Sequence, residues 1–194
     1  MAKIDIYDIT GAIIASTSIT RNCERVEELM QSDYAELSWR SDTGSPLPVG
    51  AYIVWQGEKL TLLDEYMPEQ RDELEWEYRP QFKSRIMNWS KTPFFHYTYE
   101  DKGVTREPDW TLTDNAYNFM LSIARAIENE TGEIWTIEVG AELTGTLTIH
   151  FSSIDVLSAL SEIASQFKTE WWADKKGNVL HLEKASFGQP VELR

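Results

Sequence analysis

The sequence predicts an α+β protein in which a small antiparallel β-barrel domain is followed by an α+β domain. Up to about residue 85, apolar side chains recur at every second position between turn residues, as in half-buried strands. From Thr113 onward they recur at three and four positions, as in amphipathic helices. Six or so short strands with one apolar face bury it by closing or by sandwiching, and we expect them to form the barrel.

Three segments follow from this change of spacing. Residues 1–85 form the barrel-like domain, residues 86–112 an aromatic-rich bridge, and residues 113–194 a domain with two helices, each followed by a strand pair. The sequence Leu121-Ser122-Ile123-Ala124 resembles Leu160-Ser161-Glu162-Ile163-Ala164 about 40 residues later, so an αββ repeat is one hypothesis for this domain.

The strands of the first domain are bounded by turn residues. Strands are expected over residues 4–7, 12–16, 34–39, 51–55, 60–63 and 74–82. Residues 25–30 fit either one or two helical turns or a bulged strand. In the last strand the apolar residues share the inward face: Leu74, Trp76, Tyr78, Pro80 and Phe82. Glu75 and Glu77 share the other face.

Capping residues mark two helices in the second domain. The first is expected to begin after Thr113 and to end at Thr131-Gly132, and the second to begin after Ser152 or Ser153. Strands are expected over residues 94–99, with a turn at Lys102-Gly103, and over 134–139, 147–151, 170–174 and 179–183.

The net charge excludes one class of function. The chain has 32 Asp and Glu against 18 Lys and Arg, which gives a net charge of −14. A protein that grips nucleic acid needs clustered cations, and the nearest approach is the pair Lys175-Lys176 in a predicted turn. We therefore expect no direct nucleic-acid binding, and solubility is the simplest role of the charge.

Residue types needed for catalysis or metal binding are sparse. The three His residues and the single Cys show no metal-ligand spacing, and neither a Walker loop nor a GxGxxG motif occurs. We predict no catalytic residue, no cofactor and no metal. The N-terminus lacks the apolar core of a secretion signal and no apolar run could span a bilayer, so we expect a protein made in the cytoplasm without a membrane anchor.

Carboxylates beside tryptophans leave one alternative open. Glycosidases use two nearby carboxylates with aromatic platforms, and Glu75 with Glu77, or Glu170 with Asp174, could supply such a pair. A solvated outer face explains both pairs more simply. Sugar binding by Trp171 or Trp172 is a weaker candidate role that does not require cleavage.

Several stretches resemble phage tail hub and baseplate proteins. Residues 154–172 match the form xxVLxxLxxIAxxFxxEWW and lead into the hairpin segment 174–182, as in that group. Residues 29–39, 50–53 and 76–82 resemble the barrel that opens siphophage and prophage tail proteins of this type. The likeness covers nearly the whole chain and includes no catalytic motif.

The resemblance implies a virion structural protein of the tail tip or baseplate hub. Such proteins form trimeric rings that join the tail tube to the distal tip, fibre or spike and let DNA pass without binding it specifically. The implied localisation is the virion tail, after synthesis in the bacterial cytoplasm. It also implies that the chain is the N-terminal part of a longer protein, with a second barrel or a lytic module further along.

The tail hypothesis assigns two sets of residues. The candidate interface residues are Trp89, Phe94, Phe95, Tyr97 and Trp110. The candidate acids lining a DNA passage are Asp64, Glu65, Glu75 and Glu77. The alternatives are a tail-associated cell-wall hydrolase and a carbohydrate-binding receptor module.

Overall fold

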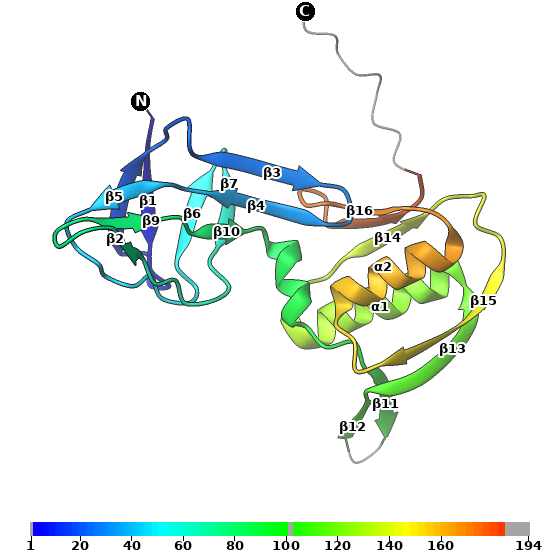
Figure 1. The fold of residues 1–194 in the computed structure, drawn as a ribbon. Helices are drawn as coiled ribbons and strands as arrows, with labels where there is room; N and C mark the ends of the chain where they lie inside the picture. Colours follow the sequence, from blue (N-terminus) through cyan, green and yellow to red (C-terminus); the bar gives the residue numbers. More distant parts are fainter. Residues whose placement is uncertain (1, 101–102, 185–194) are drawn as a thin grey trace, which may run out of the picture. The chain divides into compact units, whose positions relative to one another are not determined.

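A computed structural model describes residues 2–100 and 103–184 (Figure 1). The chain divides into two compact units, residues 1–88 and residues 89–194. The described part is a mixed α+β structure in which nearly all strand pairs are antiparallel. Each unit has its own hydrophobic core, so each is described separately.

The first unit contains a seven-stranded antiparallel sheet of strand order β2-β1-β6-β7-β10-β4-β3. Its strands are β1 (Lys3–Tyr7), β2 (Ile13–Ser18), β3 (Glu24–Glu28), β4 (Ser32–Glu36), β6 (Tyr52–Trp55), β7 (Glu58–Thr61) and β10 (Gln81–Lys83). A smaller sheet of order β5-β9-β8 is formed by β5 (Trp39–Ser41), β9 (Trp76–Tyr78) and β8 (Glu69–Gln70).

Alternation along these strands places the core as the sequence predicts. Ile4, Ile6, Ile53, Leu60 and Phe82 are buried, and their chain neighbours face outward. The ambiguous segment 25–30 is a strand up to Glu28. Its helix-like spacing reflects the turn that follows, in which Met30 takes a left-handed φ of 62° and leads into β4.

Three details of this unit differ from the prediction. The expected strand 74–82 is two strands in different sheets, because Pro80 has no N–H for a ladder; its carbonyl instead accepts from Leu37 N at 3.2 Å. Segment 34–39 likewise divides between β4 and β5. Leu74 is 78% exposed, at the turn before β9, and does not share the inward face.

In the part of the chain that the structure describes, the large sheet is not closed by hydrogen bonds between its two end strands. Its order begins at β2 and ends at β3, and within residues 2–100 these two strands are not paired with each other. No closed barrel is therefore found, and the barrel remains a prediction.

The second unit holds two helices between two sheets (Figure 1). The 3₁₀ helix η1 (Arg85–Lys91) spans the unit boundary, and β11 (His96–Glu100) pairs with β12 (Gly103–Glu107). The remaining elements are β13 (Asp109–Asn115), α1 (Ala116–Thr131), β14 (Thr136–Val139), β15 (Thr146–Ser152), α2 (Val156–Phe167), β16 (Trp171–Asp174) and β17 (Val179–Leu182). Part of the predicted turn at Lys102-Gly103 lies outside the described residues.

Each helix is followed by two strands, as predicted, but the two strand pairs are not equivalent. β16 and β17 form the expected antiparallel hairpin. β14 pairs in parallel with β17, and β15 pairs with β13. The two strands after α1 therefore belong to different sheets, and they cover opposite sides of the helices.

Both helices begin later than the sequence predicts. Asn115 caps α1 by accepting from Asn118 N at 3.0 Å, because Thr113 belongs to β13, where it pairs with Thr148. Asp155 caps α2 by accepting from Ser158 N at 2.9 Å, so neither Ser152 nor Ser153 is the cap. The predicted end of α1 is confirmed, since Gly132 takes a left-handed φ of 75°.

Lys168 ends α2 in the left-handed conformation, with φ 55° and ψ 43°. A side chain there is strained, whereas glycine adopts this conformation freely. We expect Lys168→Gly to raise the free energy of unfolding by about 0.5–1 kcal/mol, measured by urea denaturation. The control Gln166→Gly, inside the helix, should lower it by about 1 kcal/mol, and a loss of stability in Lys168→Gly would contradict the expectation.

Candidate assembly surfaces

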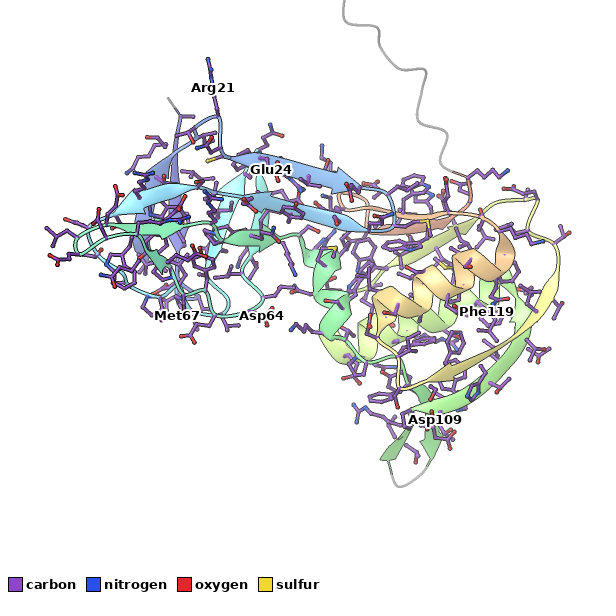
Figure 2. The ribbon with its side chains drawn as sticks, in the orientation of Figure 1. Arg21, Glu24, Asp64, Met67, Asp109 and Phe119 are labelled. Atoms are coloured by element: carbon purple, nitrogen blue, oxygen red, sulfur yellow. The ribbon has the colours of Figure 1, made fainter. Side chains whose placement is uncertain are left out.

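The predicted passage acids lie in the first unit, three of them between β7 and β9 and Glu77 within β9, and their environments differ. Asp64 and Glu65 are exposed on the loop before β8, where Asp64 and the 63% exposed Met67 are labelled in Figure 2. Glu75 is half-buried and accepts from Arg40 Nη1 at 3.1 and 3.2 Å. Asp64 and Glu65 therefore present the more accessible carboxylates.

Glu77 is 8% exposed and lies between two arginines. Arg79 donates to its Oε1 from Nη2 at 2.6 Å and from Nε at 3.0 Å, and Arg71 donates to its Oε2. These hydrogen bonds, first from Arg79 and then from Arg71, hold the pKa of the Glu77 carboxyl below its ordinary value of 4.5. The residue therefore cross-links β9 to its flanking segments, and its charge is balanced locally.

This carboxylate gives stability a pH dependence. Because the pKa of Glu77 is lowered in the folded state, its contribution is complete above pH 4.5 and is lost as the pH falls toward the lowered value. We expect Glu77→Gln to reduce the melting temperature at neutral pH, and the gap from the unmodified chain to narrow on acidification. Thermal melts in a pH series test this, with the exposed Glu73→Gln as control. A gap that stays constant with pH would contradict it.

The first unit contains a second ionic cluster, centred on Arg25, that the sequence did not predict. The Arg25 side chain on β3 is 15% exposed; it pairs with Asp33 on β4 and donates to Glu58 on β7 at 3.1 Å. It also donates to the carbonyl oxygens of Val26 and Tyr34 at 2.8 and 2.9 Å. No local spacing could have revealed the whole cluster, because Glu58 on β7 comes 33 residues after Arg25.

Most of the predicted interface aromatics are buried inside the second unit. Trp89 meets Trp135 edge-on at 5.0 Å, and Phe94 meets Phe151 and Trp110 at 4.9 and 5.2 Å. Trp89 and Phe94 are 1% exposed and Trp110 is 9% exposed. In the folded unit these three are core residues, since β13 and β15 place their inner faces against the helices.

Phe95 and Tyr97 keep partial exposure among the predicted interface residues. They lie next to each other, with ring centroids 6.3 Å apart, at the start of the β11–β12 hairpin. The Tyr97 hydroxyl donates to Glu130 on α1 at 3.1 Å. The interface hypothesis is therefore retained for these two side chains.

The two tryptophans proposed for sugar binding differ in burial. Trp171 is 2% exposed and its Nε1 donates to Ser161 Oγ at 3.3 Å, so it is not available as a platform. Trp172 is half-buried, and the His181 ring stacks on it with centroids 3.5 Å apart. One face of Trp172 is thus already occupied.

The histidines and the cysteine have structural surroundings. His96 stacks on Trp110 at 5.2 Å, His150 lies 3.0 Å from Thr111 Oγ1, and Cys23 is half-buried as a free thiol. Within residues 2–100 and 103–184, no three His, Cys, Asp or Glu side chains are grouped as a metal site would require. In the same residues, no helix has the length and apolarity to cross a membrane.

Comparison with known proteins identifies similar folds. No protein-family model matches the chain, and no curated protein matches it. The structure of the 43 kDa tail protein of prophage MuSo2 from Shewanella oneidensis is similar over 92% of this chain, with a TM-score of 0.55 and 13% identity. Prophage tail protein gp18 from Listeria monocytogenes matches 94% of the chain at a TM-score of 0.44 and 9% identity. The chain spans about half of each, 52% and 51% respectively.

Proposed function

We propose that the chain is a structural component of a phage or prophage tail. The observation that carries the proposal is its fold, which the MuSo2 43 kDa tail protein shares across both units, over 92% of this chain. The segments 154–172 and 174–182, which resemble tail hub proteins, fold as α2 and its hairpin, as they would in such a protein.

Within the tail, we assign the chain to a hub ring at the tip or baseplate. The ring joins the tail tube to distal proteins such as a fibre or spike, and three copies form it. The barrel predicted for residues 1–85 would belong to its wall. Phe95, Tyr97 and the exposed Met67 are then among the apolar side chains that we place at contacts with neighbouring proteins.

The acidic charge has a role in such a ring. Three copies would carry about three times the single-chain charge of −14, so a passage lined by them would repel phosphate and allow DNA to slide. Asp64 and Glu65, which are exposed, are the acids that we place on the passage wall. DNA passes through without specific binding in this proposal.

We assign no catalytic activity to the chain itself. Zymography on peptidoglycan separates this assignment from the tail-associated hydrolase alternative. The purified chain is expected to leave the peptidoglycan intact, and clearing by this chain alone would overturn the purely structural proposal.

Self-association is the direct consequence to measure. Multi-angle light scattering at micromolar concentration is expected to give a mass close to three times that of one chain. A single-chain mass across the accessible concentration range would contradict the ring.

A further inference from the structure

The two edge strands of the large sheet in the first unit, β2 and β3, differ in the charge of their side chains. In the described part of the chain, β2 and β3 are each paired on one side only. An edge strand presents N–H and C=O groups to which another strand can be added. Both edges belong to the first unit, and they are of similar length, with six residues in β2 and five in β3.

β2 carries no charged side chain, although the protein is strongly acidic. Its first two residues, Ile13 and Ile14, are 57% and 42% exposed. Natural edge strands are usually protected from strand addition by charges, prolines or bulges within the edge. β2 has neither a charge nor a proline, but its register against β1 shifts at Ile14, between the Ile6–Ala15 and Tyr7–Ile13 pairs. The uncharged residues 15–18, which are in regular register, are therefore the part of β2 that is suited to receive another strand.

The hydrogen-bonding pattern shows which groups of β2 are directed outward. Ile19 N donates to Ala2 O at 2.8 Å, and bonded pairs alternate along an antiparallel ladder, so Thr17 and Ala15 bond to β1. The N–H groups of Ser16 and Ser18 then point away from β1. These are the donors that an added strand would use.

β3, at the opposite end of the sheet, is acidic. It carries Glu24, Glu27 and Glu28, and its single cation, Arg25, pairs with Glu27 at 2.8 Å as well as with Asp33 and Glu58. Pairing of β3 with a second β3 would bring carboxylates opposite carboxylates, which is unfavourable. β2 presents no such repulsion, and the exposed Arg21 labelled in Figure 2 follows it in the chain. Lys3, in register with Ser18, is paired with Asp5 at 3.1 Å.

Exposed aliphatic side chains adjoin β2. Ile9 is 75% exposed and lies over Gly50, where a Cβ would meet Ile9 Cγ2 at 2.6 Å, and the neighbouring Val49 is 57% exposed. Ile13 is in register with Tyr7, whose ring stacks on Tyr52 at 5.1 Å. Covering this apolar surface would add a hydrophobic contribution to any strand pairing at β2.

The geometry points to β2 of one copy adding to β3 of a second copy of this chain. The uncharged strand, which the cation Arg21 follows, meets the acidic strand; both edges of each copy are used, and the contact is head-to-tail. A head-to-tail contact generates a closed ring when its rotation closes. The inference rests on the proposed self-association and specifies the surface that mediates it.

Ser16→Pro, compared with Ser16→Ala, tests the contact. Both variants lose the 2.5 Å bond from Ser16 Oγ to Asp5, but only proline removes an outward N–H, and it leaves the bonds to β1 in place. We expect light scattering to give the assembled mass for the unmodified chain and Ser16→Ala, and a single-chain mass for Ser16→Pro. Matching circular dichroism spectra show that both variants fold.

Two results would contradict the β2 contact, and they have different consequences for the proposed function. If Ser16→Pro assembles as well as Ser16→Ala, the β2 contact is wrong and the tail proposal stands. If the unmodified chain is itself a monomer, the contact is overturned together with the proposed ring.

A cross-linking measurement keeps the test decisive if Ser16→Pro fails to fold. In a Cys23→Ser background, chains with Ile14→Cys and chains with Glu27→Cys carry different tags and are mixed with a bismaleimide. We expect cross-links between the two kinds of chain. Cross-links confined to Ile14→Cys chains would show β2 pairing with itself and would overturn the head-to-tail contact.

Discussion

Phe151→Ala is expected to lower the free energy of unfolding by about 3–5 kcal/mol. Phe151 on β15 is 1% exposed, and its ring lies 4.9 Å from Phe94 and 5.0 Å from Trp110. It also meets Phe119 on α1 edge-on at 6.3 Å. Truncation would remove contacts to these three rings, which come from β13, α1 and the segment before β11, and leave a cavity between the β13–β15 sheet and the helices.

Urea denaturation followed by circular dichroism measures this loss. Tyr117→Ala is a suitable control because Tyr117 lies on α1 with 53% exposure, and its loss should change stability by less than about 0.5 kcal/mol. Equal effects of the two substitutions would show that the aromatic cluster is not the core of the second unit.

Gly44→Ala is expected to destabilise the first unit by about 1–3 kcal/mol through overpacking. A Cβ at position 44 would lie 2.3 Å from Cδ2 and Cε2 of the Trp76 indole, which covers the glycine. The indole cannot withdraw freely, because Trp76 is paired with Ser41 and Gln70 in the small sheet. The methyl group therefore has to displace either the ring or the loop.

Tryptophan fluorescence and a urea titration together test this effect. Gly145→Ala is the matched control, because a Cβ at that position would meet nothing within 4 Å. We expect Gly145→Ala to leave stability nearly unchanged. Gly44→Ala with unaltered stability would show that the indole does not pack on the loop at residue 44.

Periodicity predicted most elements of this fold, and its failures have local causes. The spacing of Val156, Leu160 and Ile163 predicted α2 because these residues pack on one side of a helix. The N-cap of α1 was missed because Thr113 is held in β13 by pairing with Thr148, which no local pattern reveals. The strand at 74–82 was predicted too long because Pro80 was treated as one more apolar residue of the inward face.

Placement of the candidate surfaces was less predictable than the fold. Trp89, Phe94 and Trp110 were assigned to an interface because they belong to an aromatic-rich bridge and exposed apolar patches mark association sites. Their contacts come from β15 and Trp135, more than 35 residues later. Glu77 was assigned to an outer face by alternation. Arg79, two residues away on the same side, was the available signal that its charge is paired.

Both the sequence and the strand pairing are needed to distinguish the two edges of the large sheet. Sequence shows that residues 13–18 are uncharged and that residues 24–28 include three carboxylates. Only strand pairing shows that these segments are the opposite ends of one sheet.

Negative-stain electron microscopy tests the central claim most directly, because the proposed function requires copies of this chain to surround a passage. Purified protein at micromolar concentration is predicted to show ring-shaped particles with threefold symmetry and a central hole. Fields containing only single-chain particles, or compact oligomers without a hole, would contradict the account.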